Sequence, residues 1–144
     1  MTGRLAILIG AILGASGVAL GAYHAHGLGD YLAAQQIDAD QLVKRLADAG
    51  TAARYQLTHA VALVGLGAIS VSGCRSKCLA ACVILFTLGV LFFSGGLYLY
   101  SFTGQLGHPA IIPSGGALLI AAWLALVVHA AFCWNRPPPA SSSK

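Results

Sequence analysis

Charged residues are scarce in this sequence. They make up 8% of its 144 residues, and hydrophobic residues make up 58%, whereas soluble domains carry about 25% charged residues. Charge-free runs extend from Leu5 to Gly29, from Tyr55 to Cys74 and from Cys78 up to Arg136. A soluble fold could not cover so much apolar surface, so the composition predicts an integral membrane protein.

Motifs for catalysis or phosphate binding are absent as well. The sequence contains no G-x-S-x-G, no H-E-x-x-H and no phosphate-binding loop, and no acidic residue lies within a hydrophobic run. A histidine inside the membrane would therefore have no carboxylate to orient it. We expect a protein that is not an enzyme and that carries no cofactor and no metal.

The apolar runs have the lengths of membrane-crossing helices. About 20 residues at 1.5 Å each span a hydrocarbon core of about 30 Å, and the third run is about twice as long as one crossing needs. The sequence predicts an all-α membrane domain, residues 1–136, folded as an antiparallel bundle of four transmembrane helices at 5–23, 55–72, 79–101 and 114–134. The tail at 137–144 is expected to be disordered. Cleavage of the first run as a signal peptide is the alternative, which its length and its glycines disfavour.

The segment between the first two predicted crossings is amphipathic. Over residues 39–53, apolar side chains share one helical face and charged side chains share the other. This pattern predicts a separate helix that lies flat on the outer membrane interface. Asp38 or Asp40 can cap its start, and Gly50 is expected to break the chain before the second crossing.

The positions of Lys and Arg predict the orientation of the bundle. Four crossings place five basic residues on the side of the termini and three on the other side, namely Arg4, Arg75, Lys77, Arg136 and Lys144 against Lys44, Arg45 and Arg54. Since Lys and Arg favour cytoplasmic loops, both termini should lie in the cytoplasm. The net charge of +4 is explained by this topology, so we expect no nucleic-acid partner.

The four cysteines fall near the predicted cytoplasmic side. Cys74, Cys78 and Cys82 recur at a spacing of four residues, and Cys133 should lie at the same membrane side. Disulfides are not expected in that reducing compartment. Packing is the favoured role, with lipidation and a metal site as the alternatives.

Four glycines line one side of the first predicted helix. Gly10, Gly14, Gly17 and Gly21 are separated by four, three and four residues, which at about 100° per residue places them in one narrow stripe. Small residues allow close backbone approach in lipid, where helix association gains little from the hydrophobic effect. The stripe therefore predicts a tightly packed seam with another helix.

Polar side chains concentrate where the outer ends of the four predicted helices meet. We call this set the polar cluster; its members are His24, His26, Tyr55, Gln56, His59, Ser94, Tyr98 and Ser114. Polar groups at membrane depth are costly, so each is a candidate functional residue. Three interpretations are open: a hydrogen-bond network that joins helix ends, a site for a small ligand or partner, and a metal or haem site with histidine ligands. We favour the network.

Four sequence segments resemble the domain-of-unknown-function 423 family of small four-helix membrane proteins. They are GAYHAHGL from Gly21, ARYQLTHAVAL from Ala53, FSGGLYLY from Phe93 and PSGG from Pro113. The resemblance implies a four-helix fold in a bacterial inner membrane, or in the mitochondrial inner membrane for an animal relative, and it implies no activity. Where family members have G-A-H-G, this chain has His24 before Ala25 and His26.

Three functions from different classes follow. The first is a structural, assembly or accessory membrane component, which accounts for a short chain without a catalytic constellation. The second is a transporter or channel subunit, although four helices form a narrow bundle and glycines favour tight closure. The third is a haem or metal protein that uses its histidines. The expected partners are the lipid bilayer and either another membrane protein or a second copy.

Overall fold

The fold consists of helices connected by turns. The computed structural model describes residues 3–72 and 76–132, and these contain no strand. Within these ranges the chain forms α1 (Gly3–His26), α2 (Leu28–Ala33), α3 (Ala39–Val71), α4 (Lys77–Thr103) and α5 (Ile111–Phe132). The predicted tail at 137–144, together with Cys74 and Cys133, lies outside the described residues.

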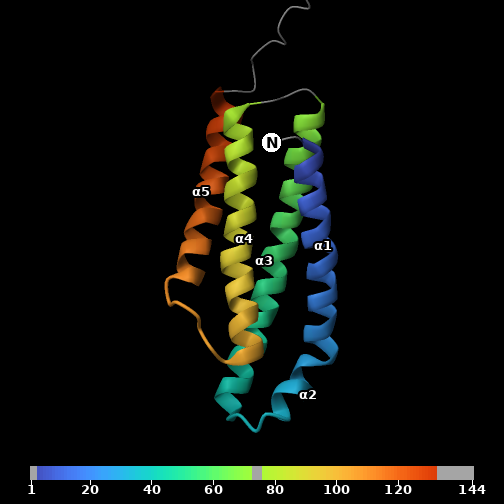
Figure 1. Ribbon diagram of the computed structural model, residues 1–144, viewed down its shortest axis with the longest axis vertical. Coiled ribbons are helices and arrows are strands. Elements are labelled where there is room, and N and C mark those ends of the chain that lie inside the picture. The colour runs from blue at the N-terminus through green and yellow to red at the C-terminus, as the bar shows by residue number, and fades with distance from the viewer. Residues whose placement is uncertain (1–2, 73–75, 133–144) are drawn as a thin grey trace, which may run out of the picture.

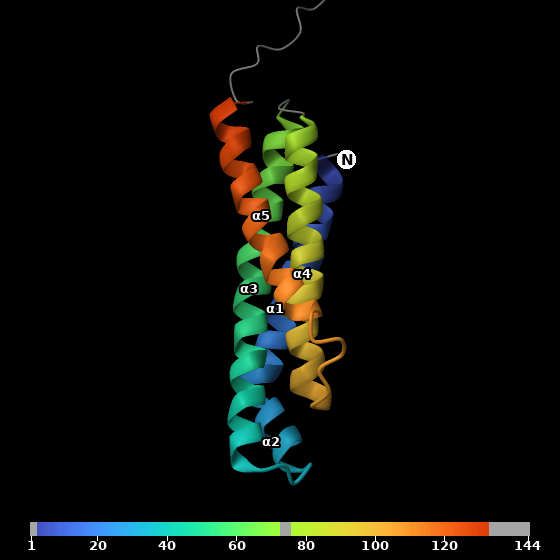
Figure 2. The same ribbon diagram turned by 90° about the vertical axis from the view of Figure 1, so that its left-hand side faces the viewer.

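The four long helices run alternately up and down (Figure 1). Helix α1 packs on α3, α3 packs on α4, and α4 packs on α5. The starts of α1 and α4 and the ends of α3 and α5 lie at one end of the bundle. The short helix α2 and the start of α3 form the opposite end, and both extend beyond the last turn of α4 (Figures 1 and 2). We call this opposite end the α2 end.

Local sequence explains where the helices begin and end. The side chain of Asp38 accepts a hydrogen bond from the backbone N–H of Gln41 at 2.8 Å and so caps the start of α3. Ser76 caps α4 in the same way, with 3.0 Å from its Oγ to the amide nitrogen of Leu79. At the end of α4, Gly104 has a φ of 71°, the left-handed conformation that favours glycine.

Three helices of the described ranges are long and apolar enough to cross a membrane. They are α1, α4 and α5, with 24, 27 and 22 residues, or roughly 33 to 40 Å at 1.5 Å per residue. They contain the predicted crossings at 5–23 and 79–101 and most of the one at 114–134. The predicted crossing at 55–72 falls in the second half of α3, which is not among the three.

The prediction of a separate interfacial helix is wrong. Residues 39–53 form the first half of α3, and the helix continues through Gly50 without a break. Gly50 lies against the ring of His24, where a Cβ would be 3.2 Å from Cε1. Protein covers part of the apolar face of this segment, because Ala49 packs in a core with Leu28 and Leu32 of α2, whereas Val43 on the same face is 66% exposed. The amphipathic pattern reflects that contact.

The glycine stripe of α1 faces α3. A Cβ at Gly10 would lie 2.8 Å from the carbonyl oxygen of Ala60, and one at Gly17 would lie 2.9 Å from Leu57. At Gly14 and Gly21 the nearest atoms would be 4.0 and 3.9 Å away, which is ordinary contact. A Cβ at Gly3, which is not part of the predicted stripe, would lie 2.6 Å from the carbonyl oxygen of Gly67.

Candidate functional site

His59 is the most completely bonded member of the polar cluster. It lies in α3 with 4% of its surface exposed. Its Nδ1 is 2.6 Å from the carbonyl oxygen of Tyr55, and its Nε2 is 3.2 Å from the indole nitrogen of Trp123 in α5. Because an indole N–H only donates, Nε2 must accept, and Nδ1 carries the proton that is donated to Tyr55. Both ring nitrogens of the neutral imidazole are therefore engaged.

Aromatic rings enclose His59. The ring centroids of Phe86, Tyr55 and Trp123 lie 5.5, 5.9 and 6.1 Å from that of His59. Tyr55 itself is 44% exposed, and its ring packs on Phe93 of α4 at 4.7 Å. These contacts connect α3 to both α4 and α5 around one buried imidazole.

Gln56 connects α3 to α1. Its side chain is 4% exposed, and its Nε2 donates to the carbonyl oxygen of Leu13 and to Oγ of Ser16, each at 2.8 Å. An amide buried at this depth needs such partners, because an unpaired one would cost about 1 to 3 kcal/mol. Gln56 therefore holds the seam that the glycines of α1 allow to close.

His24 lies apart from His59. Its Nε2 is 3.0 Å from the carbonyl oxygen of Leu46, and its ring packs against Gly50. His59 is nine residues further along α3 than Gly50, which corresponds to about 13 Å of helix. The structure does not bring these two histidines together at one depth.

The remaining members of the cluster fall into two groups. His26 and Ser114 are exposed, and the hydroxyl of Ser114 donates to the carbonyl oxygen of Ile111 in its own helix. Ser94 and Tyr98 lie one turn apart in α4, and both of their hydroxyl oxygens are buried without a partner among the described residues. The cluster is thus several separate contacts at different depths.

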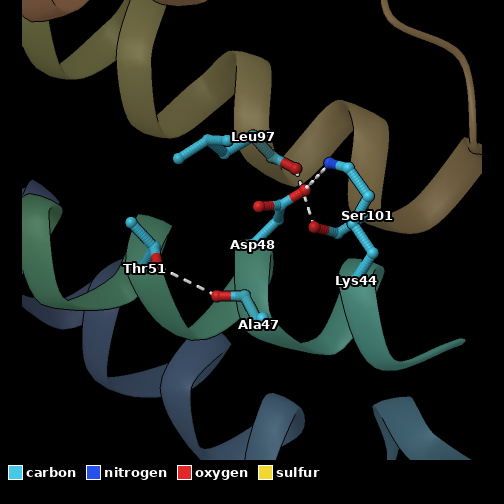
Figure 3. Close-up of polar contacts among 6 residues, drawn as sticks. All are labelled: Lys44, Ala47, Asp48, Thr51, Leu97 and Ser101. Atoms are coloured by element: carbon cyan, nitrogen blue, oxygen red, sulfur yellow. Dashed lines mark hydrogen bonds and ion pairs between the residues drawn. The ribbon is translucent and has the colours of Figure 1, made fainter. Parts of the chain in front are cut away.

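A second set of polar residues lies where α3 packs on α4, nearer the α2 end (Figure 3). Lys44 and Asp48 form an ion pair at 2.6 Å, and the ammonium group of Lys44 also lies 4.4 Å from the ring centroid of Tyr100. Figure 3 shows Asp48 pointing from α3 toward the turn of α4 that carries Ser101. Hydrogen bonding to Asp48 is the largest cause that raises the pKa of Lys44.

A known protein family matches more than half of this chain. The sequence pattern of a family described as "Protein of unknown function (DUF423)" matches residues 20–116. The chain belongs to the DUF423 family. It is therefore a multi-pass protein of the bacterial inner membrane.

Relatives of this DUF423 protein are similar over most of their length. A UPF0382 membrane protein of Staphylococcus haemolyticus is 35% identical over 125 residues, covering 87% of this chain and 93% of the relative. The UPF0382 inner membrane protein YgdD of Escherichia coli is 30% identical over 130 residues, covering 90% and 92%. A UPF0382 membrane protein of Haemophilus influenzae is 34% identical over 110 residues, covering 76% of this chain and 79% of the relative. No solved structure matches the chain significantly.

The DUF423 match includes the whole polar cluster but leaves out part of the glycine stripe. All members of the polar cluster fall within the DUF423 match at residues 20–116, whereas Gly10 and Gly17 of the seam precede it. No group of three or more potential metal ligands occurs in the part of this DUF423 protein that the structure describes.

The sequence did not predict several polar residues of the DUF423 protein that form hydrogen bonds between helices. Ser16 and Trp123 supply partners for Gln56 and His59, but neither carries a distinctive spacing. His129 in α5 is 1% exposed, and its Nδ1 lies 3.2 Å from Oγ of Ser76. A histidine inside an apolar run is itself a signal, so His129 could have been found from sequence.

Proposed function

We propose that this chain crosses the membrane four times, with α3 as the fourth crossing helix. No Lys, Arg or Asp follows Arg54 in α3. The two most polar side chains of this half are Gln56 and His59, and both are hydrogen-bonded to neighbouring helices. Because these bonds compensate for the polar groups inside lipid, the bundle can hold α3 at membrane depth.

The proposed orientation has both termini in the cytoplasm and the α2 end outside. Its support is the bias of Lys and Arg toward the side of the termini. In this arrangement the first half of α3 projects beyond the hydrocarbon region together with α2. The whole of α3, 33 residues long, corresponds to about 50 Å, which exceeds a hydrocarbon thickness of about 30 Å.

The proposed function is that of a structural, assembly or accessory membrane component without enzymatic activity. The observation that carries it is the bonding of His59, whose ring nitrogens are both used by Tyr55 and Trp123. A general base or metal ligand needs a ring nitrogen that can reach its target. The buried side chains of Gln56 and His59 connect α3 to α1 and to α5, which is what a packing component requires.

The experiment combines a deletion strain with variants of the two residues whose side chains connect helices. We expect loss of the protein to deplete one other membrane protein from the inner membrane, and a tagged copy to co-purify with that protein at a fixed ratio in mild detergent. The variants Gln56→Ala and His59→Ala should restore that protein in proportion to their own folded amount. A variant that folds fully but restores nothing would contradict the structural role.

One observation favours the second candidate, a transporter or channel subunit. Ser94 and Tyr98 place two buried hydroxyl oxygens on one side of α4 that have no partner within residues 3–72 and 76–132, and such groups usually interact with water or a ligand. Solute uptake by proteoliposomes that contain the purified protein alone, lost in Tyr98→Phe, would support this candidate over the accessory role.

The third candidate, a haem or metal protein, receives less support from the geometry. His24 of α1 lies beside Gly50, nine residues before His59 in α3, and the ring nitrogens of His59 already have partners. A visible absorption band or a stoichiometric metal in the purified protein, abolished in His59→Ala, would nevertheless establish it over the accessory role.

A further inference from the structure

A buried arginine lies between the turn that follows α2 and the end of α4. Arg45 in α3 is 8% exposed, and its NH1 group donates to the side-chain oxygen of Gln35 at 3.3 Å. Its NH2 group lies over Gly104, the residue at which α4 ends, and a Cβ at Gly104 would overlap that group. One side chain of α3 therefore contacts both of these chain segments.

The carboxyl end of α4 compensates for the charge of Arg45. No aspartate among residues 3–72 and 76–132 forms an ion pair with it, since the ion pair found there joins Lys44 to Asp48. Its Nε has no partner within these ranges either. The last carbonyl groups of a helix have no partner within the helix and carry the negative end of its dipole, which stabilises a cation. The guanidinium group lies at such an end.

The turn that follows α2 is strained. Gln36, directly after Gln35, has a φ of 54° and is the non-glycine residue with a positive φ in the described ranges. Such a conformation is unfavourable for a residue with a side chain and persists where the surrounding structure holds it. The hydrogen bond from Arg45 to Gln35 joins this turn to α3 and so helps to hold it.

Helix α2 is too short to be stable by itself. It has six residues, Leu28–Ala33, and isolated helices of fewer than about 12 residues are marginal in water. Its fold depends on Leu28 and Leu32, which are fully buried in a core with Ala49 of α3. Phe102 of α4 packs against the same core. Release of the turn after α2 would therefore expose apolar surface of all three helices.

We propose that Arg45 is a latch that keeps α2 closed over the apolar core of the α2 end. In the closed state, NH1 holds the turn at Gln35, and the carboxyl end of α4 holds NH2, for which Gly104 leaves the space. In the open state both contacts are broken and α2 separates from α3 and α4, while the four long helices stay packed. The latch depends neither on the orientation of the chain in the membrane nor on the accessory function.

Hydrogen–deuterium exchange of the purified full-length protein in detergent measures this opening, because a protected amide exchanges when its local structure opens. The wild type is compared with Arg45→Gln, Gln35→Ala and Arg54→Gln. Arg54→Gln is the matched control, because Arg54 is exposed on the same helix and its NH2 donates to Thr51 within that helix at 3.1 Å. Thermal unfolding of each variant reports on the bundle as a whole.

We expect the amides of residues 28–38 to exchange about tenfold faster in Arg45→Gln than in the wild type, the effect of removing the contacts of a charged group. Gln35→Ala should accelerate them by about threefold, because the contact of Arg45 with α4 remains. Amides in the middle of α3 and α4 should be unaffected, and Arg54→Gln should match the wild type. Unchanged exchange at 28–38 in Arg45→Gln, or equal acceleration throughout α3 and α4, would overturn the proposal.

A substitution at Gly104 tests the other side of the latch. Gly104→Ala places a Cβ where NH2 lies, so it should accelerate exchange at 28–38 as Arg45→Gln does. Gly107→Ala is the control, because its Cβ would lie 3.7 Å from the nearest atom. Alanine at a φ of 71° is strained even without the arginine, so Gly104→Ala is also made in the Arg45→Gln background. There it should add little at 28–38; equal acceleration in both backgrounds would contradict the latch.

Gln35→Ala decides the case in which Arg45→Gln does not fold. Gln35 is exposed, so its truncation leaves the apolar core intact and removes the hydrogen bond to Arg45. Faster exchange confined to residues 28–38 supports the latch. Exchange equal to that of the wild type would show that Arg45 does not hold the turn, and the proposal would fail.

Discussion

At the scale of single residues, the pair formed by His59 and Trp123 explains how a histidine and an indole are tolerated inside the bundle. Each supplies what the other lacks, since the indole N–H donates to the ring nitrogen that needs a donor. The sequence placed His59 in the polar cluster at membrane depth. It could not indicate Trp123 as the partner, because 64 residues separate the two in the chain.

We expect His59→Ala to lower the stability of the bundle. The change leaves the N–H of Trp123 without a partner, which costs about 1 to 3 kcal/mol in addition to the cavity. Thermal unfolding in detergent measures the effect, with His26→Ala as the control because His26 is exposed.

A double-mutant cycle separates the hydrogen bond from general packing. Trp123→Phe keeps an aromatic ring but removes the donor, so combining it with His59→Ala should cost less than the sum of the single changes, by about 0.5 to 3 kcal/mol. Strict additivity would show that His59 and Trp123 act independently.

The ion pair of Lys44 and Asp48 leads to a prediction about pH. The pKa of Lys44 is raised above its usual 10.5, chiefly by the hydrogen bond to Asp48. A raised pKa means that the pair stabilises the fold fully below about pH 10.5 and stops doing so as the pH rises through the pKa of the folded state. Because Lys44 is 57% exposed, solvent screening keeps the contribution below about 1 kcal/mol.

Unfolding of Asp48→Asn between pH 8 and pH 12 checks this prediction. The variant should be slightly less stable than the wild type at pH 8, and the difference should shrink above pH 10.5 and in high salt. Asp40→Asn should show no such alkaline dependence, since Asp40 forms no ion pair in the described ranges. A constant difference for Asp48→Asn at all pH values would contradict the assigned role.

At the scale of helices, the seam between α1 and α3 depends on which glycines make the close approach. Sequence spacing placed Gly10, Gly14, Gly17 and Gly21 in one stripe, and all four do face α3. Spacing alone could not predict at which of these glycines the backbone of α1 comes too close to α3 for a Cβ. That distinction depends on the rotation of α3 and on the size of its residues, such as Ala60 opposite both Gly10 and Gly14.

We expect Gly10→Ala to destabilise the bundle by about 1 to 3 kcal/mol, because its Cβ would meet the carbonyl oxygen of Ala60 at 2.8 Å. Gly14→Ala is the matched control. Its Cβ would lie 4.0 Å from the nearest atom, so alanine should be neutral or stabilise the helix by up to about 1 kcal/mol. Thermal unfolding of both variants in the same detergent decides; equal losses would show that the seam is not specific at Gly10.

Helix α3 shows why one element was predicted incorrectly. An amphipathic segment at residues 39–53 has the same pattern whether its apolar face meets lipid or protein. In this structure the face meets protein, because Leu28 and Leu32 of α2 are fully buried against it. Only six residues long, α2 has too little periodicity to be recognised in the sequence.

At the scale of the whole molecule, the hydrophobic runs predicted the all-helical fold and its antiparallel order, because lipid permits few other arrangements of apolar segments. The depth of each polar residue was harder to predict. Grouping His24 with His59 in one cluster assumed that the second long helix starts near residue 55. Helix α3 instead starts at Ala39 and extends beyond α4 at the α2 end (Figure 2), so that His24 lies beside Gly50.

The orientation of the molecule gives the last prediction, which compares the two ends of α3. In a background without native cysteines, Asp38→Cys lies just before α3 and Ser72→Cys just after it; both positions are exposed. If α3 crosses the membrane and the α2 end is outside, a membrane-impermeant thiol reagent added to intact cells should label Asp38→Cys and leave Ser72→Cys unlabelled. Permeabilised cells should allow labelling of both, which controls for reactivity. The reverse pattern would place the termini outside, and labelling of both in intact cells would show that α3 does not cross.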